Sequence, residues 1–113
     1  MRKVLIAAVA AVGLVMGAVP AAAVEHKEYI GVYWNTISFT YGNAQGGNGG
    51  VMRSIWMDRA TSSNPARWDG RLGLRREAYL TGIESHGNTY WWRTCFETPG
   101  SNSRVLCGSW FHP

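Results

Sequence analysis

Residues 88–113 read NTYWWRTCFETPGSNSRVLCGSWFHP, and this stretch decides the fold class. It holds both cysteines, and two runs rich in aromatic and β-branched residues flank a central TPGSNS segment. Such a segment favours a tight turn, because Pro presets φ while Gly and Asn accept a positive φ. The stretch therefore predicts a β-hairpin with strands over residues 89–97 and 104–111.

A disulfide between Cys95 and Cys107 is expected to close this hairpin and fix its register; two free buried thiols are the alternative. With the cysteines opposite each other, the expected pairs are Trp92 with Trp110, Phe96 with Leu106 and Glu97 with Val105. Side chains alternate between the two sides of a sheet. The core side would therefore carry Tyr90, Trp92, Phe96, Leu106 and Trp110. The opposite side would carry the disulfide, Trp91, Arg93, Glu97, Val105 and Phe111.

The first residues are typical of a secretory signal peptide. Arg2 and Lys3 precede an apolar run over residues 4–19, and small residues follow Pro20. This pattern predicts cleavage after Ala23, so residues 1–23 form the signal and residues 24–113 a single small secreted domain of bacterial type. A retained anchor is the alternative, because a bilayer span needs about 20 apolar residues. After cleavage we expect no membrane span, and an extracellular address agrees with a disulfide.

The composition favours a protein that binds through aromatic side chains and argues against a nucleic-acid partner. All 6 Trp, 5 Tyr and 3 Phe lie after residue 23. The chain has 11 Lys and Arg against 7 Asp and Glu. Without Arg2 and Lys3 the cations fall to 9 against 7 acids, a net charge of +2. This small excess argues against nucleic acid, whose binding relies on phosphate neutralisation.

The first half of the expected domain predicts strands around a glycine-rich loop. Residues 24–27 are expected to be a mobile polar arm, and residues 28–40 to be strand with a bend at Asn35-Thr36. Residues 42–50 contain five glycines and predict a flexible loop. Residues 51–59 favour a strand, although their apolar spacing also fits a helical stripe.

Two further turns complete the sequence-based topology. Asp69-Gly70 is typical of a type I′ turn. A second turn at His86-Gly87 would pair residues 71–84 with the C-terminal hairpin, setting Ile83 opposite Tyr90, Thr81 opposite Trp92 and Tyr79 opposite Thr94. We therefore expect an all-β fold, a small antiparallel sandwich or open barrel of about six to eight short strands.

No residue pattern indicates a metal, a cofactor or catalysis. The histidines, His26, His86 and His112, lack metal-ligand spacing, and the cysteines are expected in the bridge. No Gly-x-Ser-x-Gly or comparable nucleophile motif is present. Nothing in the sequence brings Glu84 and Glu97 into one cleft, as a glycosidase requires. We therefore expect no metal, no cofactor and no enzymatic activity.

The expected binding patch comprises Trp91, Arg93, Glu97 and Phe111, on the side of the hairpin opposite the core. Aromatic rings beside polar groups suit sugar rings, and Trp and Arg dominate protein-binding hot spots. The sequence thus predicts a non-catalytic module for an extracellular glycan or protein, and carries no indication of an oligomeric state. A second small core under Trp91 and Phe111 is the alternative. Two other functions stay open: a bacteriocin or toxin acting on a competitor's envelope, and a protease inhibitor presenting residues 98–103.

Two resemblances accompany this interpretation. Residues 87–92, followed by Pro99-Gly100-Ser101, resemble the Gly-x-x-Tyr, Trp-Trp and Pro-Gly pattern of small chitin-binding modules, with a different spacing between the Tyr and the Trp pair. A signal followed by a short aromatic β-domain is similar to small secreted bacteriocins of the lactococcin type, without their N-terminal Gly-Gly-Gly-Thr-Trp motif. We assign the chain to neither family.

Overall fold

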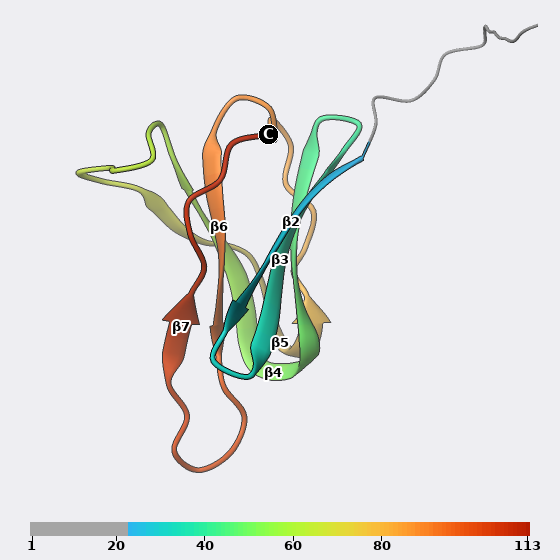
Figure 1. Cartoon of the computed structure of the whole chain (residues 1–113), viewed down its shortest axis with the longest axis vertical. Coiled ribbons are helices and arrows are strands. Elements are labelled where there is room, and N and C mark those ends of the chain that lie inside the picture. Colours follow the sequence, from blue (N-terminus) through green and yellow to red (C-terminus); the bar gives the residue numbers. More distant parts are fainter. Residues whose placement is uncertain (1–22) are drawn as a thin grey trace, which may run out of the picture.

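The computed structural model describes residues 23–113, which form one curled antiparallel sheet (Figure 1). Its strands are β2 (Val24–Ile30), β3 (Tyr33–Thr40), β4 (Asn43–Ala60), β5 (Asp69–Leu80), β6 (Trp91–Glu97) and β7 (Val105–Cys107). The predicted all-β antiparallel class is confirmed, in its open-barrel form. Among the described residues there is no helix that could cross a membrane. The predicted signal peptide lies outside these residues apart from Ala23, and the alternative anchor apart from Ala23 and Val24.

The central element of the sheet is β4, a strand of 18 residues. Its first half pairs with β3 and its second half with β6, while β5 runs along its other edge. In Figure 1 the strand descends, turns at the bottom of the view and rises again. The two halves consequently face each other, since Gly46 lies against the Thr94 side chain while Met57 pairs with the same residue. This curl encloses the core.

The glycines of residues 42–50 do not form the flexible loop that their composition predicted. Residues 43–50 belong to β4, and three of the glycines lie beneath side chains of other strands. A Cβ at Gly46 would stand 2.5 Å from Thr94 Oγ1, and one at Gly47 would stand 2.7 Å from Thr36 Oγ1. Glycine within a strand often marks such a close approach. Here the packing of distant residues outweighs local loop propensity.

The N-terminal part of the sheet also differs from expectation. Residues 24–27, predicted as a mobile arm, form the start of β2 and pair with β3. The chain reverses at Gly31-Val32 rather than at Asn35-Thr36, and Gly31 supplies the positive φ of 63°. Asn35 stays in the strand because it is paired in the sheet and its Nδ2 donates a hydrogen bond to the carbonyl of Thr94, 2.8 Å away.

Asp69-Gly70 begins β5 instead of forming the predicted type I′ turn. Arg59 pairs with Asp69 across β4 and β5, and its Nη2 lies 2.7 Å from Asp69 Oδ2. This ion pair and the backbone pairing keep the segment extended. The reversal is made by the preceding loop, residues 61–68.

The predicted pairing of residues 79–83 with residues 90–94 is wrong. Instead, β5 pairs with β4, Thr81 N donates to Gly46 O at 3.0 Å, and Glu84 bridges Ala44. The long β4 offers a free edge along its whole length. That edge competes successfully with the short hairpin expected at His86-Gly87.

The C-terminal hairpin is confirmed together with its Cys95–Cys107 disulfide and the predicted pairs at positions 96 and 97. The register changes beyond Cys107, where Gly108 N donates to Thr94 O at 2.9 Å and Trp92 bridges Phe111 rather than Trp110. A slip of one residue exchanges the two sides of a strand. Phe111 therefore faces the core, and Trp110 faces outward.

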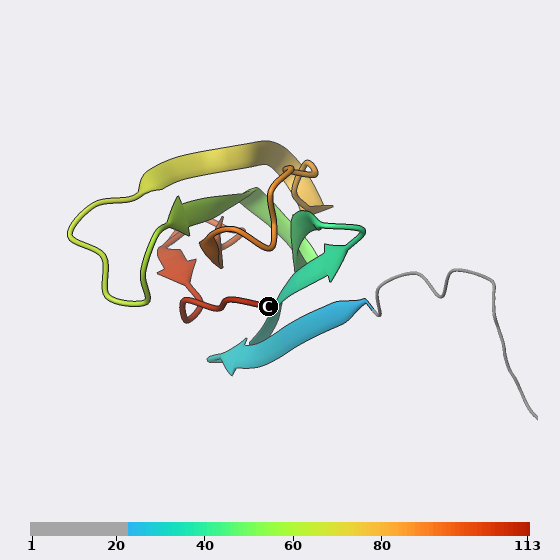
Figure 2. The same cartoon turned by 90° about the horizontal axis from the view of Figure 1, so that it is seen from above.

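Two apolar clusters and a set of buried polar residues fill the curl. One cluster is centred on Ile37, Phe39, Ala44, Met57 and Trp92, the other on Met52, Ile55 and Phe96. Where β3 faces β6, the hydrogen bonds run from side chains to backbone carbonyls. Thr94 Oγ1 donates to Thr36 O at 2.6 Å, and Asn35 Nδ2 donates to Thr94 O. Glu28 accepts hydrogen bonds from Ser109 N and Oγ at 2.7 and 2.9 Å. These bonds hold the C-terminal segment beside β2, as seen from above in Figure 2.

Candidate functional site

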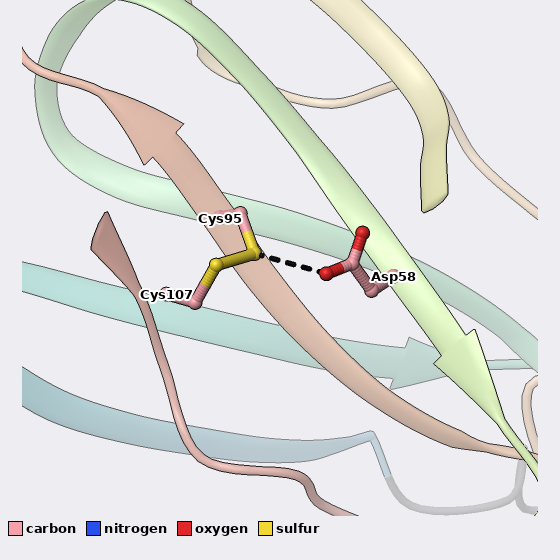
Figure 3. Close-up of side chains that lie close together, drawn as sticks. All are labelled: Asp58, Cys95 and Cys107. Atoms are coloured by element: carbon pink, nitrogen blue, oxygen red, sulfur yellow. Dashed lines mark hydrogen bonds between the residues drawn. A yellow bond between two sulfur atoms is a disulfide. The ribbon is translucent and has the colours of Figure 1, made fainter. Parts of the chain in front are cut away.

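The outer side of β4 and β6 contains a buried ion pair between Asp58 and Arg93. Figure 3 shows Asp58 beside the Cys95–Cys107 disulfide. Arg93 lies opposite Asp58, and its Nε donates to Asp58 Oδ2 at 2.8 Å. Asp58 is only 4% exposed, and its Oδ2 is 3.3 Å from Cys95 Sγ. Because both sulfurs are joined in the disulfide, neither has a proton to donate, and neither is a free thiolate for a metal. Asp58 therefore acts as the fixed partner of Arg93.

The guanidinium of Arg93 packs against two tryptophans. Its central carbon is 5.0 Å from the ring centroid of Trp68 and 4.6 Å from that of Trp110, and the two rings are 6.0 Å apart. Guanidinium groups stack on indoles through cation–π attraction and dispersion. At the end of β6, Trp91 packs 5.4 Å from the ring of His112. We call Trp68, Trp91, Arg93 and Trp110 the arginine–tryptophan cluster.

A groove of about 340 Å³ adjoins this cluster at the 61–68 loop. Trp68, Arg59, Arg67, Thr61 and Tyr90 contribute to its lining. Arg59 is held in place by Asp69 and lies over the ring of Tyr90, 4.7 Å from its centroid. Trp68 is 49% exposed. The groove, here called the Trp68 groove, therefore combines an accessible indole with guanidinium donors and a hydroxyl.

The residues predicted for the binding patch are only partly brought together. Trp91 and Arg93 belong to the cluster. Glu97 lies at the other end of β6, where it accepts hydrogen bonds from Ser54 Oγ at 3.2 Å and Ser103 Oγ at 3.5 Å. Phe111 was expected on this face but packs against the core, with its ring stacked on that of His26 at 4.6 Å. A binding role for these residues stays a prediction.

Sequence reasoning missed Trp68 and Trp110. Trp110 was placed inside because strict alternation was continued through Gly108, where the register changes. Trp68 lies in an irregular loop, to which no alternation rule applies. Its position next to Arg67 and Asp69 was the available signal, since a tryptophan flanked by charges is more easily accommodated at the surface.

Charge is unevenly distributed along the chain. Lys27 is the one lysine or arginine in residues 23–50, against Glu25 and Glu28. Residues 51–113 have eight arginines against five acids, and these arginines are Arg53, Arg59, Arg67, Arg71, Arg75, Arg76, Arg93 and Arg104. The part of the chain that builds the cluster is therefore the basic one.

Compared with known proteins, the chain matches no family model, and no curated protein or solved structure shows significant similarity to it.

Proposed function

We propose that the protein is a secreted, non-catalytic binding module that holds a negatively charged extracellular glycan at the arginine–tryptophan cluster and the Trp68 groove. The observation that carries this proposal is the stack of Trp68 on Arg93, which is itself fixed by the buried Asp58. A half-exposed indole held in this way offers a stacking surface for a sugar ring.

Preorganisation favours binding at this position. Ordering a mobile side chain on binding costs about 0.5–1.5 kcal/mol, and a ring already held by its neighbours avoids much of that cost. The planar guanidinium of Arg67, at the rim of the groove, suits two-pronged hydrogen bonding to a carboxylate or phosphate. The excess of arginine in residues 51–113 adds long-range attraction for such a ligand.

The experiment is a titration with polygalacturonic acid, monitored by tryptophan fluorescence and calorimetry, with neutral dextran added as a competitor that should leave this binding unchanged. Trp68→Ala and Arg67→Gln should each weaken binding about tenfold, equivalent to about 1.4 kcal/mol. Arg104→Gln is the matched control, because Arg104 is also exposed but lies by the 98–103 turn, away from the groove. Affinities of Trp68→Ala and Arg67→Gln equal to that of the unaltered protein would contradict the proposal.

If the acidic ligand is a polymer of a competitor's cell envelope, the same surface would serve a bacteriocin. Growth inhibition by the purified, oxidised protein separates the two roles, because a plain binding module leaves target cells unharmed. Loss of killing in Trp68→Ala would assign toxicity to the arginine–tryptophan cluster.

A further inference from the structure

A second groove, of about 330 Å³, lies beside the β2–β3 turn and is separate from the Trp68 groove. In Figure 1 this turn is at the lower end of the strands, whereas the 61–68 loop projects at the upper left. The lining comprises Tyr29, Val32, Tyr33, Trp34, Asn48, Gly49 and Gly50. We propose that this groove, here called the Trp34 groove, binds an uncharged glycan chain.

The floor of the Trp34 groove is an indole laid against the sheet. Trp34 lies over Gly49, where an added Cβ would overlap Cδ1 and Nε1 of the indole. Tyr29 is directly opposite Trp34 on β2, so the two rings share one side of the sheet. Trp34 is 41% exposed, Tyr29 71% and Val32 87%. A glycine beneath the indole thus lets the ring lie against the sheet while part of its surface remains exposed.

Polar groups accompany this surface. Asn48 shapes the wall of the groove but is only 7% exposed, because its Nδ2 donates to Asn35 Oδ1 at 3.4 Å and its Oδ1 accepts from Gly50 N at 3.3 Å. The hydrogen-bonding group that a ligand can reach is the ammonium of Lys27. The Nζ of Lys27 lies 4.0 Å from the centroid of the Trp34 ring. Lysine is long and flexible, so a ligand can displace this ammonium at small cost and then hydrogen-bond to it. Stacking surface and hydrogen-bonding groups therefore occur together, as sugar recognition requires.

The same side of the sheet extends the site along β3. Alternation places Trp34, Thr36, Ser38 and Thr40 on one side of this strand. The row ends at a smaller groove of about 200 Å³, which Ser38, Thr40, Tyr41, Gln45 and Ile83 help to line. At about 3.3 Å per residue, the distance from Trp34 to Thr40 is about 20 Å. A row of hydroxyls between two aromatic ends suits an extended oligosaccharide.

Charge decides in favour of an uncharged ligand. The outward side of β2 carries Glu25 and Lys27, whose charges cancel, and Glu25 already accepts a hydrogen bond from Ser38 Oγ at 3.3 Å. The arginines that would attract a polyanion belong to residues 51–113. A neutral chain has no Coulombic preference for either half. The row of hydroxyls along β3 is what favours the Trp34 groove for an extended neutral chain.

The experiment measures binding of uncharged probes, namely a soluble β-glucan, mannan and chitin oligosaccharides, by calorimetry and by gel retardation in polymer-containing gels. Trp34→Ala should weaken binding of at least one probe about tenfold, and Trp68→Ala should leave it unchanged. Lys27→Met removes the ammonium but keeps an apolar side chain of similar length, so it should weaken binding less than Trp34→Ala does. Circular dichroism and urea denaturation establish that each variant is folded.

Three outcomes would overturn the proposal: no retention of any neutral probe, equal binding by Trp34→Ala, or self-association that Trp34→Ala abolishes, which would identify a protein interface instead. The result is independent of the acidic-glycan proposal. Arg67→Gln affects only the acidic ligand and Trp34→Ala only the neutral one, so either site can fail without the other.

Discussion

Reduction of the Cys95–Cys107 disulfide is expected to remove about 3 kcal/mol of folding stability. The cysteines are 12 positions apart, and closing a loop of that length restricts the unfolded chain by about this amount. Domains of this size have about 5–15 kcal/mol in total, so the loss is a large share. With a shift of about 4–8 °C per kcal/mol, the thermal midpoint should fall by roughly 12–24 °C.

Asp58 predicts a further distinction between reducing the bond and deleting the sulfurs. Once reduced, Cys95 has a thiol proton, and its Sγ is 3.3 Å from Asp58 Oδ2, within reach of a weak hydrogen bond. In the double variant Cys95→Ala/Cys107→Ala this donor is lost, and a fully buried sulfur is replaced by empty space. We expect the double variant to be about 1 kcal/mol less stable than the reduced protein.

Urea denaturation of the three forms tests both steps. The dependence of the unfolding free energy on urea should rise on reduction, because the unfolded chain without the cross-link exposes more surface. The double variant with and without reductant is the control, since its midpoint must not change. A loss below about 1 kcal/mol on reduction would refute the loop-closure reasoning. A double variant as stable as the reduced protein would refute the role given to Asp58.

Three further predictions concern packing, and urea denaturation measures each. Gly46→Ala should lower the free energy of unfolding by about 2 kcal/mol, because its Cβ would stand 2.5 Å from Thr94 Oγ1. Gly50→Ala is the control: its Cβ would be 3.7 Å from the nearest methyl group, so stability should change by less than about 0.5 kcal/mol. Equal effects would contradict the close approach at Gly46. Thr94→Val should cost about 1–3 kcal/mol by leaving the partly buried carbonyl of Thr36 without its 2.6 Å hydrogen bond. Thr94→Ser keeps that bond and should lose only about 1 kcal/mol for the methyl group; an opposite order would rule out the bond as the cause. Phe111→Ala should lower the free energy of unfolding by about 2–3 kcal/mol and Trp110→Ala by under about 1 kcal/mol. The opposite order would mean that Trp110, as strict alternation predicted, faces the core.

The parts of the fold that the sequence predicted are those set by neighbours along the chain. The C-terminal hairpin follows from turn residues between two β-rich runs, and the cysteines fix the register of the three residue pairs between β6 and β7. The segment over residues 51–59 was ambiguous, and strand was favoured because nine residues between breakers make a marginal helix; these residues belong to β4. Such features depend on local chemistry, which a single sequence contains.

The missed features depend on contacts between distant residues. Gly49 favours a loop by composition, and only the indole of Trp34 above it explains its place in a strand. Gly108 ends the regular register where Glu28 approaches, since a Cβ there would stand 2.6 Å from Glu28 Oε2. That partner is 80 positions away. Because Glu28 lies so close to Gly108, the register changes there, Phe111 faces the core and Trp110 faces outward, where it becomes part of the candidate site.

The contact of β2 with the C-terminal segment has a consequence for motion. Glu28, Ser109, His26 and Phe111 join these two segments through hydrogen bonds to a carboxylate and one stacked ring pair, with no ladder of backbone bonds between them. Separating the two segments would leave every strand pairing intact, so local opening of the curled sheet should cost the least free energy here. Solvent should therefore enter the curled sheet first between β2 and the C-terminal segment, before any strand unfolds.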